Sequence, residues 1–375
     1  MMINDSTLTK TLGNRFGLWP SRAETLGWLV RLTVEKGSVC MHRLSARIAT
    51  DAKLASTRQR LRRFFEQVTL DEAEEARLLT DQLGLCGKRG WDLQVDRTSW
   101  DFGDTTHNVL TLSVLWNGTA VPLFWIMLDT EGNSDPGERS NLLQKVRDVF
   151  PDQSIASLTG DREFVGHDWL AWLAANHIPF VMRHRENMHA FREGQVPVQL
   201  KWLARDLKRG ETLNLKGGWR IGRPERDASP PVFLAIRRLK KDGTLLILAA
   251  SFSAKKALAV YRLRWKIETL FGLLKTKGFN LEDTHMKDPK RLSTLFAILA
   301  IAAVLVVKVG HAAHRITPIP TKKHGRPARS LFAFGIDILR RCFVRSNIQQ
   351  IFAAIVFLLG PKTRCNPLLR LGFAK

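Results

Sequence analysis

The sequence predicts an α/β protein with helical regions at both ends. Three observations support this prediction. Residues 91–128 contain runs in which apolar and polar residues alternate, which is the period of a β-strand. A short apolar strand then ends at Gly160 and precedes a helical stretch, as in an α/β unit. Before residue 86 and after residue 290, the apolar pattern is helical instead.

The first 85 residues are expected to form a helical domain. Apolar residues recur at helical spacing in Thr25–Val34 and in Leu44–Phe65. Arginines gather late in the second stretch, at Arg58, Arg60, Arg62 and Arg63. We expect Arg58 and Arg62 to contact DNA from a small helix-turn-helix-like module. An exposed basic helix that only keeps the domain soluble is the alternative, and the pattern leaves both open.

Residues 86–184 are expected to form the first part of the sheet. Trp91, Leu93 and Val95 alternate with polar residues and give its first strand. The pair Asn117-Gly118 is typical of a hairpin turn. The other expected elements are strands Val109–Leu115, Ala120–Leu128 and Ile178–Met182 and a helix that contains Trp169–Ala175.

Two aspartates follow this pattern at positions suited to a site. Asp96 lies at or near the end of the first strand, and Asp161 comes directly after the strand that ends at Gly160. Residues just past the carboxyl ends of strands in an α/β sheet are frequent site residues. Each aspartate alone is weak evidence, because turn and strand-flanking aspartates are common.

A third acidic residue lies on a predicted helix between Tyr261 and Lys275. At roughly 100° per residue, Tyr261, Arg264, Glu268 and Lys275 fall within about 60° of one another. The opposite stripe is apolar. A face with one carboxylate, two cations and a phenol suits a phosphate backbone and a metal ion. The alternative is an ordinary solvated face of mixed charge.

Together, Asp96, Asp161 and Glu268 could hold divalent metals through oxygen ligands. Two such ions about 3.5–4 Å apart can activate a nucleophile and stabilise the leaving oxygen in phosphodiester displacement. The order of strand aspartate, strand aspartate and helix glutamate is therefore a sharper signal than any one of these residues.

The remaining stretches complete the predicted organisation. Residues 185–245 are rich in Arg, Lys and Gly, with strand-like pieces at Val196–Leu200 and Val232–Ile236. Residues 246–316 contain the wholly apolar run Leu295–Val307, which is shorter than a membrane span of about 20 residues and predicts a core helix. Residues 317–375 begin with a proline-broken basic linker and continue with helices Leu331–Arg341 and Ile348–Leu359.

The sequence resembles a DDE transposase of bacterial insertion sequences, in the group with a Tyr-x2-Arg-x3-Glu-x6-Lys signature. Tyr261, Arg264, Glu268 and Lys275 match that signature at every spacing. The segments 160–164 (Gly-Asp-Arg-Glu-Phe) and 95–98 (Val-Asp-Arg-Thr) resemble the family's second and first aspartate motifs. The resemblance covers residues 90–310 well.

This resemblance implies an RNase H-like catalytic core, formed by residues 86–184 and 246–316 around a β-rich insert at 185–245. It also implies that Asp96, Asp161 and Glu268 bind Mg2+ or Mn2+, with two ions per site. Tyr261, Arg264 and Lys275 would grip phosphates near the cleaved end, and Arg162 would contact DNA or orient the site.

In relatives, water attacks at the element end and the freed 3′-hydroxyl then forms a hairpin, which is reopened before the ends join target DNA. Some relatives carry a tryptophan in the strand ahead of the signature helix, where it stacks near a flipped base. Here that strand, residues 243–252, contains none. Whether excision passes through a hairpin therefore stays open.

The composition agrees with a DNA-binding enzyme. The chain has 58 Lys and Arg against 35 Asp and Glu, a net charge of +23, and residues from Lys255 onward hold 23 basic and 5 acidic side chains. Such a chain attracts polyanions. Its four cysteines are scattered, without zinc or disulfide spacing, and no signal-peptide pattern begins the chain. We expect a bacterial cytoplasmic protein associated with the nucleoid and not with a membrane.

The function expected from all these features is cut-and-paste transposition. The partners would be double-stranded DNA, as the element's terminal inverted repeats and the target, and a second copy of the chain in the synaptic complex. Two alternatives are a metal-dependent nuclease on the same fold and a non-catalytic DNA-binding protein derived from a transposase.

Overall fold

The computed structural model describes residues 6–87, 90–128, 132–225, 228–323 and 325–344. It divides into two compact units. The first comprises Met1–Cys86, Ser99–His107 and Thr269–Lys375, and the second comprises Gly87–Thr98 and Asn108–Glu268. The five-part division drawn from the sequence is finer than this and stays a prediction. The expected helix Ile348–Leu359 lies outside the described residues.

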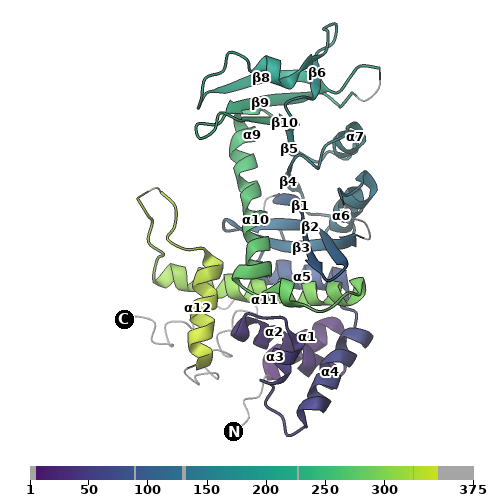
Figure 1. Ribbon diagram of the computed structural model, residues 1–375, viewed down its shortest axis with the longest axis vertical. Helices are drawn as coiled ribbons and strands as arrows, with labels where there is room; N and C mark the ends of the chain where they lie inside the picture. Colours follow the sequence, from purple (N-terminus) through teal and green to yellow (C-terminus); the bar gives the residue numbers. More distant parts are fainter. Residues whose placement is uncertain (1–5, 88–89, 129–131, 226–227, 324, 345–375) are drawn as a thin grey trace. The chain divides into compact units, whose positions relative to one another are not determined.

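A mixed sheet is the centre of the second unit (Figure 1). Among the described residues, ten strands lie in the order β3-β2-β1-β4-β5-β10-β9-β8-β6-β7. Their bounds are β1 Trp91–Phe102, β2 Thr105–Trp116, β3 Thr119–Leu128, β4 Ile155–Gly160, β5 Phe180–His184, β6 His189–Phe191, β7 Val198–Gln199, β8 Thr212–Ile221, β9 Val232–Arg238 and β10 Leu245–Ala250. The chain is therefore a mixed α/β protein with a large sheet, as the sequence predicts.

The strand directions bring the predicted motifs together. β1 runs parallel to β4, with Gln94 opposite Thr159, and β4 runs parallel to β5. Beyond β5, the strands β10, β9 and β8 pair antiparallel. The predicted hairpin between β2 and β3 is confirmed, because Asn117 and Gly118 both have positive φ, as a tight two-residue hairpin turn requires.

The lengths of β1 and β7 are among those that differ from the prediction. β1 does not end near Asp96 but continues to Phe102, because an alternation of buried and exposed residues resumes at Thr98. The expected strand Val196–Leu200 is reduced to the two residues of β7, since the short helix α8 (Leu200–Leu203) begins at Leu200.

Helices cover both faces of this sheet (Figure 1). α6 (Pro136–Val149) and α7 (His167–Ala175) lie on one face, and α9 (Ala254–Tyr261) lies on the other, against β10, β9 and β5. Small side chains bring α9 close to the sheet: Ala254 and Ala257 of the helix pack with Ala235 and Ala250 of the strands. This contact fixes the helix that carries the predicted signature.

The signature segment is not one regular helix. α9 passes into a 3-10 turn at Arg262–Arg264, then into α10 (Trp265–Gly272), and ends in a π turn at Leu273–Lys277. In a 3-10 turn, side chains at i and i+3 eclipse each other. Tyr261 and Arg264 are therefore aligned more closely than a regular α-helix would align them.

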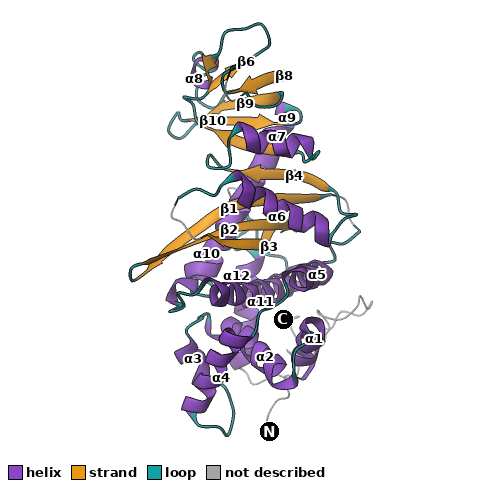
Figure 2. Ribbon diagram, turned by 90° about the vertical axis from the view of Figure 1, so that its right-hand side faces the viewer, coloured by secondary structure: helices purple, strands orange, loops and turns teal. Residues whose placement is uncertain are grey.

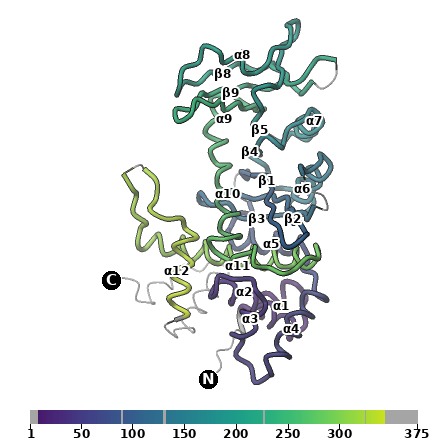
Figure 3. Tube along the Cα trace, in the orientation of Figure 1, coloured from purple at the N-terminus to yellow at the C-terminus, as the bar shows by residue number. Residues whose placement is uncertain are grey.

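The first unit is helical, apart from the tip of the β1–β2 hairpin (Figure 2). Its helices are α1 Ser6–Phe16, α2 Pro20–Lys36, α3 Met41–Ser45, α4 Leu54–Gln67, α5 Glu72–Leu83, α11 Pro289–Ile316 and α12 Leu331–Val344. In this unit α11 packs against α2, α4, α5 and α12, so segments far apart in the sequence lie side by side (Figure 3).

The apolar run at 295–307 belongs to α11, which is 28 residues long. By length and composition this helix could cross a membrane, so the expectation that it is too short does not hold for the whole element. However, 89% of its most apolar window is buried inside the protein. The burial, rather than the length, favours the predicted core helix.

Candidate active site

Asp96 and Asp161 come from neighbouring parallel strands. Continuing the register of β1 and β4 beyond Gln94 and Thr159 places Asp96 level with Asp161, which directly follows the last residue of β4. Asp96 is thus in the middle of β1, but at the height where its neighbour ends. The parallel register therefore places the two aspartates at the same level, at the carboxyl end of β4.

Glu268 reaches the same place from α10, one helical turn after Arg264. The Arg264 guanidinium pairs with Glu268 Oε1, as residues at i and i+4 of a helix can. Its Nη1 lies 3.2 Å from Asp96 Oδ2, and its Nη2 lies 3.9 Å from Asp161 Oδ2. The three acidic residues singled out in the sequence therefore converge on one guanidinium.

Arg264 is almost completely enclosed in this cluster. Its side chain is 4% exposed, against 15% for Asp96, 31% for Asp161 and 36% for Glu268. Burial alone would lower the pKa of Arg264, but Tyr261 and the three carboxylates around it more than offset burial, so its pKa is raised. The guanidinium stays charged and neutralises part of the acidic cluster.

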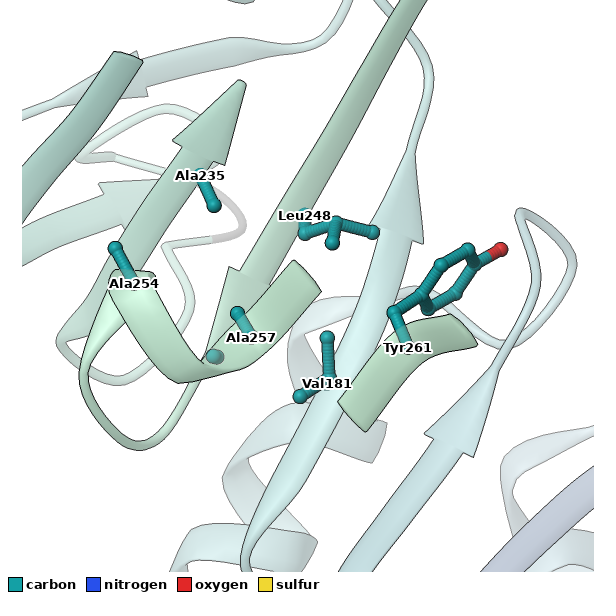
Figure 4. Close-up of a cluster of buried hydrophobic side chains, with 7 residues drawn as sticks. Val181, Ala235, Leu248, Ala254, Ala257 and Tyr261 are labelled. Carbon is teal, nitrogen blue, oxygen red and sulfur yellow. The ribbon is translucent and has the colours of Figure 1, made fainter. Parts of the chain in front are cut away.

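Tyr261 ties the cluster to the helix–sheet contact. Its hydroxyl donates to Asp161 Oδ1 at 3.2 Å. Figure 4 shows its ring beside Val181, Leu248 and Ala257, with the hydroxyl pointing away from these side chains. Burial is the main cause of its raised pKa, so the phenol stays protonated and acts as a donor.

A second layer of charged residues surrounds the carboxylates. Arg183 Nη1 lies 3.6 Å from Asp161 Oδ1. Arg97, which follows Asp96, pairs with Glu163 at 3.3 Å and donates to Asn108 at 3.1 Å. The sequence reasoning assigned no role to Arg97 or Glu163, although each stands beside a motif aspartate. Their position next to those motifs was the available signal.

Burial also changes the acidity of Asp96. Removal from solvent raises the pKa of its carboxyl to about 7, against the lowering effects of the Arg97 backbone N–H and of Arg264; Glu163 and Asp161 raise it further. The Arg97 N–H donates to Asp96 Oδ1 at 2.9 Å. The Asp96 carboxyl therefore holds its proton more readily than a free aspartic acid does.

The donor chemistry of the cluster fits a hard divalent cation, since Mg2+ and Mn2+ prefer carboxylate oxygens. The spacing in this structure is that of an arginine-bridged cluster. Within the described part of the chain, no three His, Cys, Asp or Glu side chains are grouped as metal ligands would be. The residues that could hold the ion are Asp96, Asp161 and Glu268.

The family comparison identifies the family of the chain. Residues 43–305 match the family model described as a transposase DDE domain. The chain belongs to this transposase family. DDE transposases generally use divalent metal ions, so the three converging carboxylates agree with the family's chemistry.

Two other comparisons add less. Among solved structures, the transposase is similar to the cryo-EM structure of piggyBac transposase synaptic complex with hairpin DNA (SNHP), at 13% sequence identity and a TM-score of 0.45. The alignment covers 96% of this chain and 84% of that chain. A TM-score this low does not establish a shared fold. No curated protein matches the chain.

Lys275 and Arg162 are the other two residues near the motifs that the sequence predicts to bind DNA. Lys275 belongs to the first unit, where its Nζ donates to the Ser99 carbonyl at 2.7 Å and pairs with Glu282 at 2.8 Å. Arg162 is exposed beside Asp161. Their predicted contacts with DNA stay predictions.

Arg58 and Arg62 line a cavity of about 560 Å³ in the first unit. Arg43 also lines it and pairs with Asp283 at 2.9 Å, and Arg58 contacts His42 at 3.2 Å. We call this cavity the basic groove. Arg60 is turned away into the unit instead, where it pairs with Glu24 and stacks on Trp28. The four clustered arginines therefore do not share one environment.

Proposed function

We propose that this transposase cleaves the ends of a bacterial insertion sequence and joins them to target DNA, with Asp96, Asp161 and Glu268 as ligands of Mg2+ or Mn2+. The observation that carries the proposal is the convergence of these three carboxylates on Arg264 in a chain of the DDE transposase family. The mixed sheet, with its two aspartates on adjacent parallel strands, supports an RNase H-like core.

Bound divalent ions would polarise the phosphodiester and help generate the attacking oxygen. The protein's own contribution is orientation. Tyr261 donates to one oxygen of Asp161 and leaves the other for the centre of the site. The Arg97 N–H does the same for Asp96. Fixed carboxylates lose less freedom when a ligand binds, which favours a productive geometry.

The basic groove is our candidate for binding the element ends. It collects Arg43, Arg58 and Arg62 in a chain of net charge +23. Counterion release from neutralised phosphates would supply the affinity. Because two ends must be cut and joined together, we further propose a homodimer in the synaptic complex and a place of action in the cytoplasm, where the bacterial chromosome lies.

The first test is cleavage of duplex DNA that carries the inverted repeats expected beside the gene. Asp96→Asn, Asp161→Asn and Glu268→Gln should each remove cleavage and strand transfer, while binding of the same duplex persists. Asp104→Asn, an exposed carboxylate on the β1–β2 turn, serves as the control and should cut normally. Cleavage without strand transfer by the wild type would point to a nuclease instead. Cutting by any of the three variants would refute the metal assignment.

The second test concerns the basic groove. Arg58→Ala combined with Arg62→Ala should weaken DNA binding and reduce the slope of log affinity against log salt by about 2, because each phosphate contact contributes about 0.9. Arg63→Ala is the matched control, since Arg63 is exposed on the same helix but does not line the groove. An equal loss of DNA binding in Arg63→Ala would show that the arginines act through general charge and not through the groove.

A further inference from the structure

Arg264 lies where the three carboxylates face one another. It contacts Asp96 at 3.2 Å and Asp161 at 3.9 Å, and it pairs with Glu268. One buried cation thereby holds together acidic groups from β1, from the end of β4 and from α10. Without that positive charge, the three carboxylates would repel one another in a site that is partly shielded from water.

The same arrangement makes Arg264 compete with a metal ion for the carboxylate oxygens. Mg2+ binds oxygens at about 2.0–2.1 Å and demands near-octahedral geometry. Asp96 and Glu268 already accept hydrogen bonds from the guanidinium, and Asp161 forms an ion pair with it. A doubly charged ion among them would also lie within a few ångströms of the Arg264 charge, where repulsion between like charges is strong. The guanidinium and the ion therefore compete for the same ligands.

We propose that Arg264 is a positioning residue with two states. Before DNA binds, it holds the carboxylates together and withholds them from metal; when another anion takes its guanidinium, the carboxylates become free to bind metal. The inference rests on the proposed function, in which that anion is a phosphate of the DNA substrate. Metal loading then depends on the presence of substrate.

Aromatic side chains beside Arg264 provide a path along which its guanidinium can leave the carboxylate cluster. Its Cζ lies 5.6 Å from the ring of Tyr261 and 5.6 Å from the ring of Trp265, and Trp265 is 62% exposed. Arginine is weakly hydrated and stacks on aromatic faces, so it can follow these rings toward the surface. Arg262 and Lys266, both exposed next to Trp265, add positive charge that attracts a phosphate there.

The decisive experiment is a Mn2+ titration of the DNA-free protein, followed by electron paramagnetic resonance. Arg264→Gln removes the charge and should bind Mn2+ about tenfold more tightly than wild type, a typical size for coupling between ligands. Arg183→Gln is the control, because Arg183 pairs with Asp161 from the edge of the cluster at 3.6 Å, and it should change the affinity much less. A merely structural role for Arg264 predicts weaker binding, so an unchanged or lower affinity would overturn the proposal.

Arg264→Lys covers the case in which the glutamine variant does not fold, as judged by circular dichroism. A lysine ammonium is a point charge that cannot bridge three carboxylates as a guanidinium fork does. This variant should therefore bind Mn2+ several-fold more tightly than wild type. Equal affinities would overturn the proposal.

The proposed dependence of metal binding on DNA is tested on the wild-type protein. The repeat duplex bound most tightly in gel shifts should raise its Mn2+ affinity at least fivefold after subtraction of a DNA-only titration, and it should have little effect on Arg264→Gln. An affinity that DNA leaves unchanged would contradict this dependence. If cleavage needs all three carboxylates but Arg264→Gln binds Mn2+ no more tightly, this inference fails and the proposed function stands. If the carboxylate variants still cut, the proposed function itself fails.

Discussion

The Tyr261 hydroxyl is a neutral donor that points at Asp161 in the candidate site. It lies 3.2 Å from Asp161 Oδ1, next to the positive charges of Arg264 and Arg183. A hydrogen bond to a charged group contributes about 1.5–3 kcal/mol when buried, and Asp161 is partly exposed.

We expect Tyr261→Phe to keep the ring packing and lower the free energy of unfolding by about 1 kcal/mol. It should also weaken Mn2+ binding several-fold, since Asp161 loses its orientation. Urea denaturation and the metal titration check the two effects separately. If the free energy of unfolding and the Mn2+ affinity of Tyr261→Phe both match wild type, the hydroxyl does not contribute to the site.

His184 gives a pH dependence that can be worked out from its surroundings. The ring is fully buried at the end of β5, and neither nitrogen has a hydrogen-bond partner among the described residues. Burial lowers the pKa of its imidazole from 6.5 to about 4. Between these values the unfolded chain binds the proton and the folded chain does not, so stability falls as the pH falls.

We therefore expect the free energy of unfolding to be unaffected by this group above about pH 6.5 and to drop by about 3 kcal/mol as the pH approaches 4. His184→Phe should remove this part of the pH dependence. His167→Gln, an exposed histidine, is the control and should leave it intact. Urea unfolding across this pH range is the measurement, and an unaltered profile in His184→Phe would contradict the assignment.

Sequence reasoning reached the residues of this site but not their arrangement. The i, i+4 spacing of Arg264 and Glu268 and the strand-end position of Asp161 follow from local periodicity. The contact between Arg264 and Asp96 spans 168 residues and depends on how α9 packs on the sheet, which no local pattern encodes. A buried guanidinium within the carboxylates was therefore not foreseen, and the helix face was expected to meet phosphate directly.

At the level of elements, α11 and α12 cross at two glycines. A Cβ added to Gly310 would lie 1.9 Å from the Leu331 carbonyl oxygen, and one added to Gly335 would lie 2.0 Å from that of Val306. Both distances are to backbone, which cannot move as a side chain can. The close approach of the two helices thus depends on the absence of side chains at the crossing.

Alanine normally stabilises a helix by about 1 kcal/mol relative to glycine. At Gly310 the sign should reverse, and Gly310→Ala should destabilise the protein by about 1–3 kcal/mol because of overpacking. Gly272→Ala in α10 is the control, since its Cβ would meet only side-chain carbons of Lys277 at 3.8 and 4.0 Å. Thermal unfolding of both variants measures the change in stability. A stabilised Gly310→Ala would contradict the close approach of α11 and α12.

Helix lengths and breaks were harder to predict than helix positions. The signature segment carries a continuous apolar stripe, which predicts one helix over 261–275. In the structure, however, a 3-10 turn contains the buried Arg264, and a π turn ends just before Gly278. The proline-broken basic linker after α11 contains an isolated bridge between Thr321 and Pro327, which the sequence pattern does not predict.

At the scale of the whole molecule, the N-terminal helices and α11 form one compact unit. The Thr294 hydroxyl donates to the Val68 carbonyl, and Arg340 of α12 donates to the Val34 carbonyl. The boundary near residue 85, which the helical apolar pattern predicts, is therefore crossed by contacts between the N-terminal helices and α11 and α12. Sequence patterns mark where helices lie, but they do not say which distant helices share a core.

Deletion of residues 1–86 should consequently do more than remove DNA binding. It would uncover the apolar surface of α11, so we expect the shortened chain to aggregate or to bind a hydrophobic dye strongly. Supplying residues 1–86 as a separate co-expressed chain should restore part of the solubility. A soluble shortened protein with an unchanged melting temperature would contradict the shared core.

Tyr261 is the only tyrosine in the chain, and its hydroxyl contacts Asp161. Biosynthetic incorporation of 3-fluorotyrosine would therefore place a single fluorine nucleus at the carboxylate cluster and nowhere else. One resonance would then follow protonation, ion loading and substrate engagement at that position, without any side chain being removed.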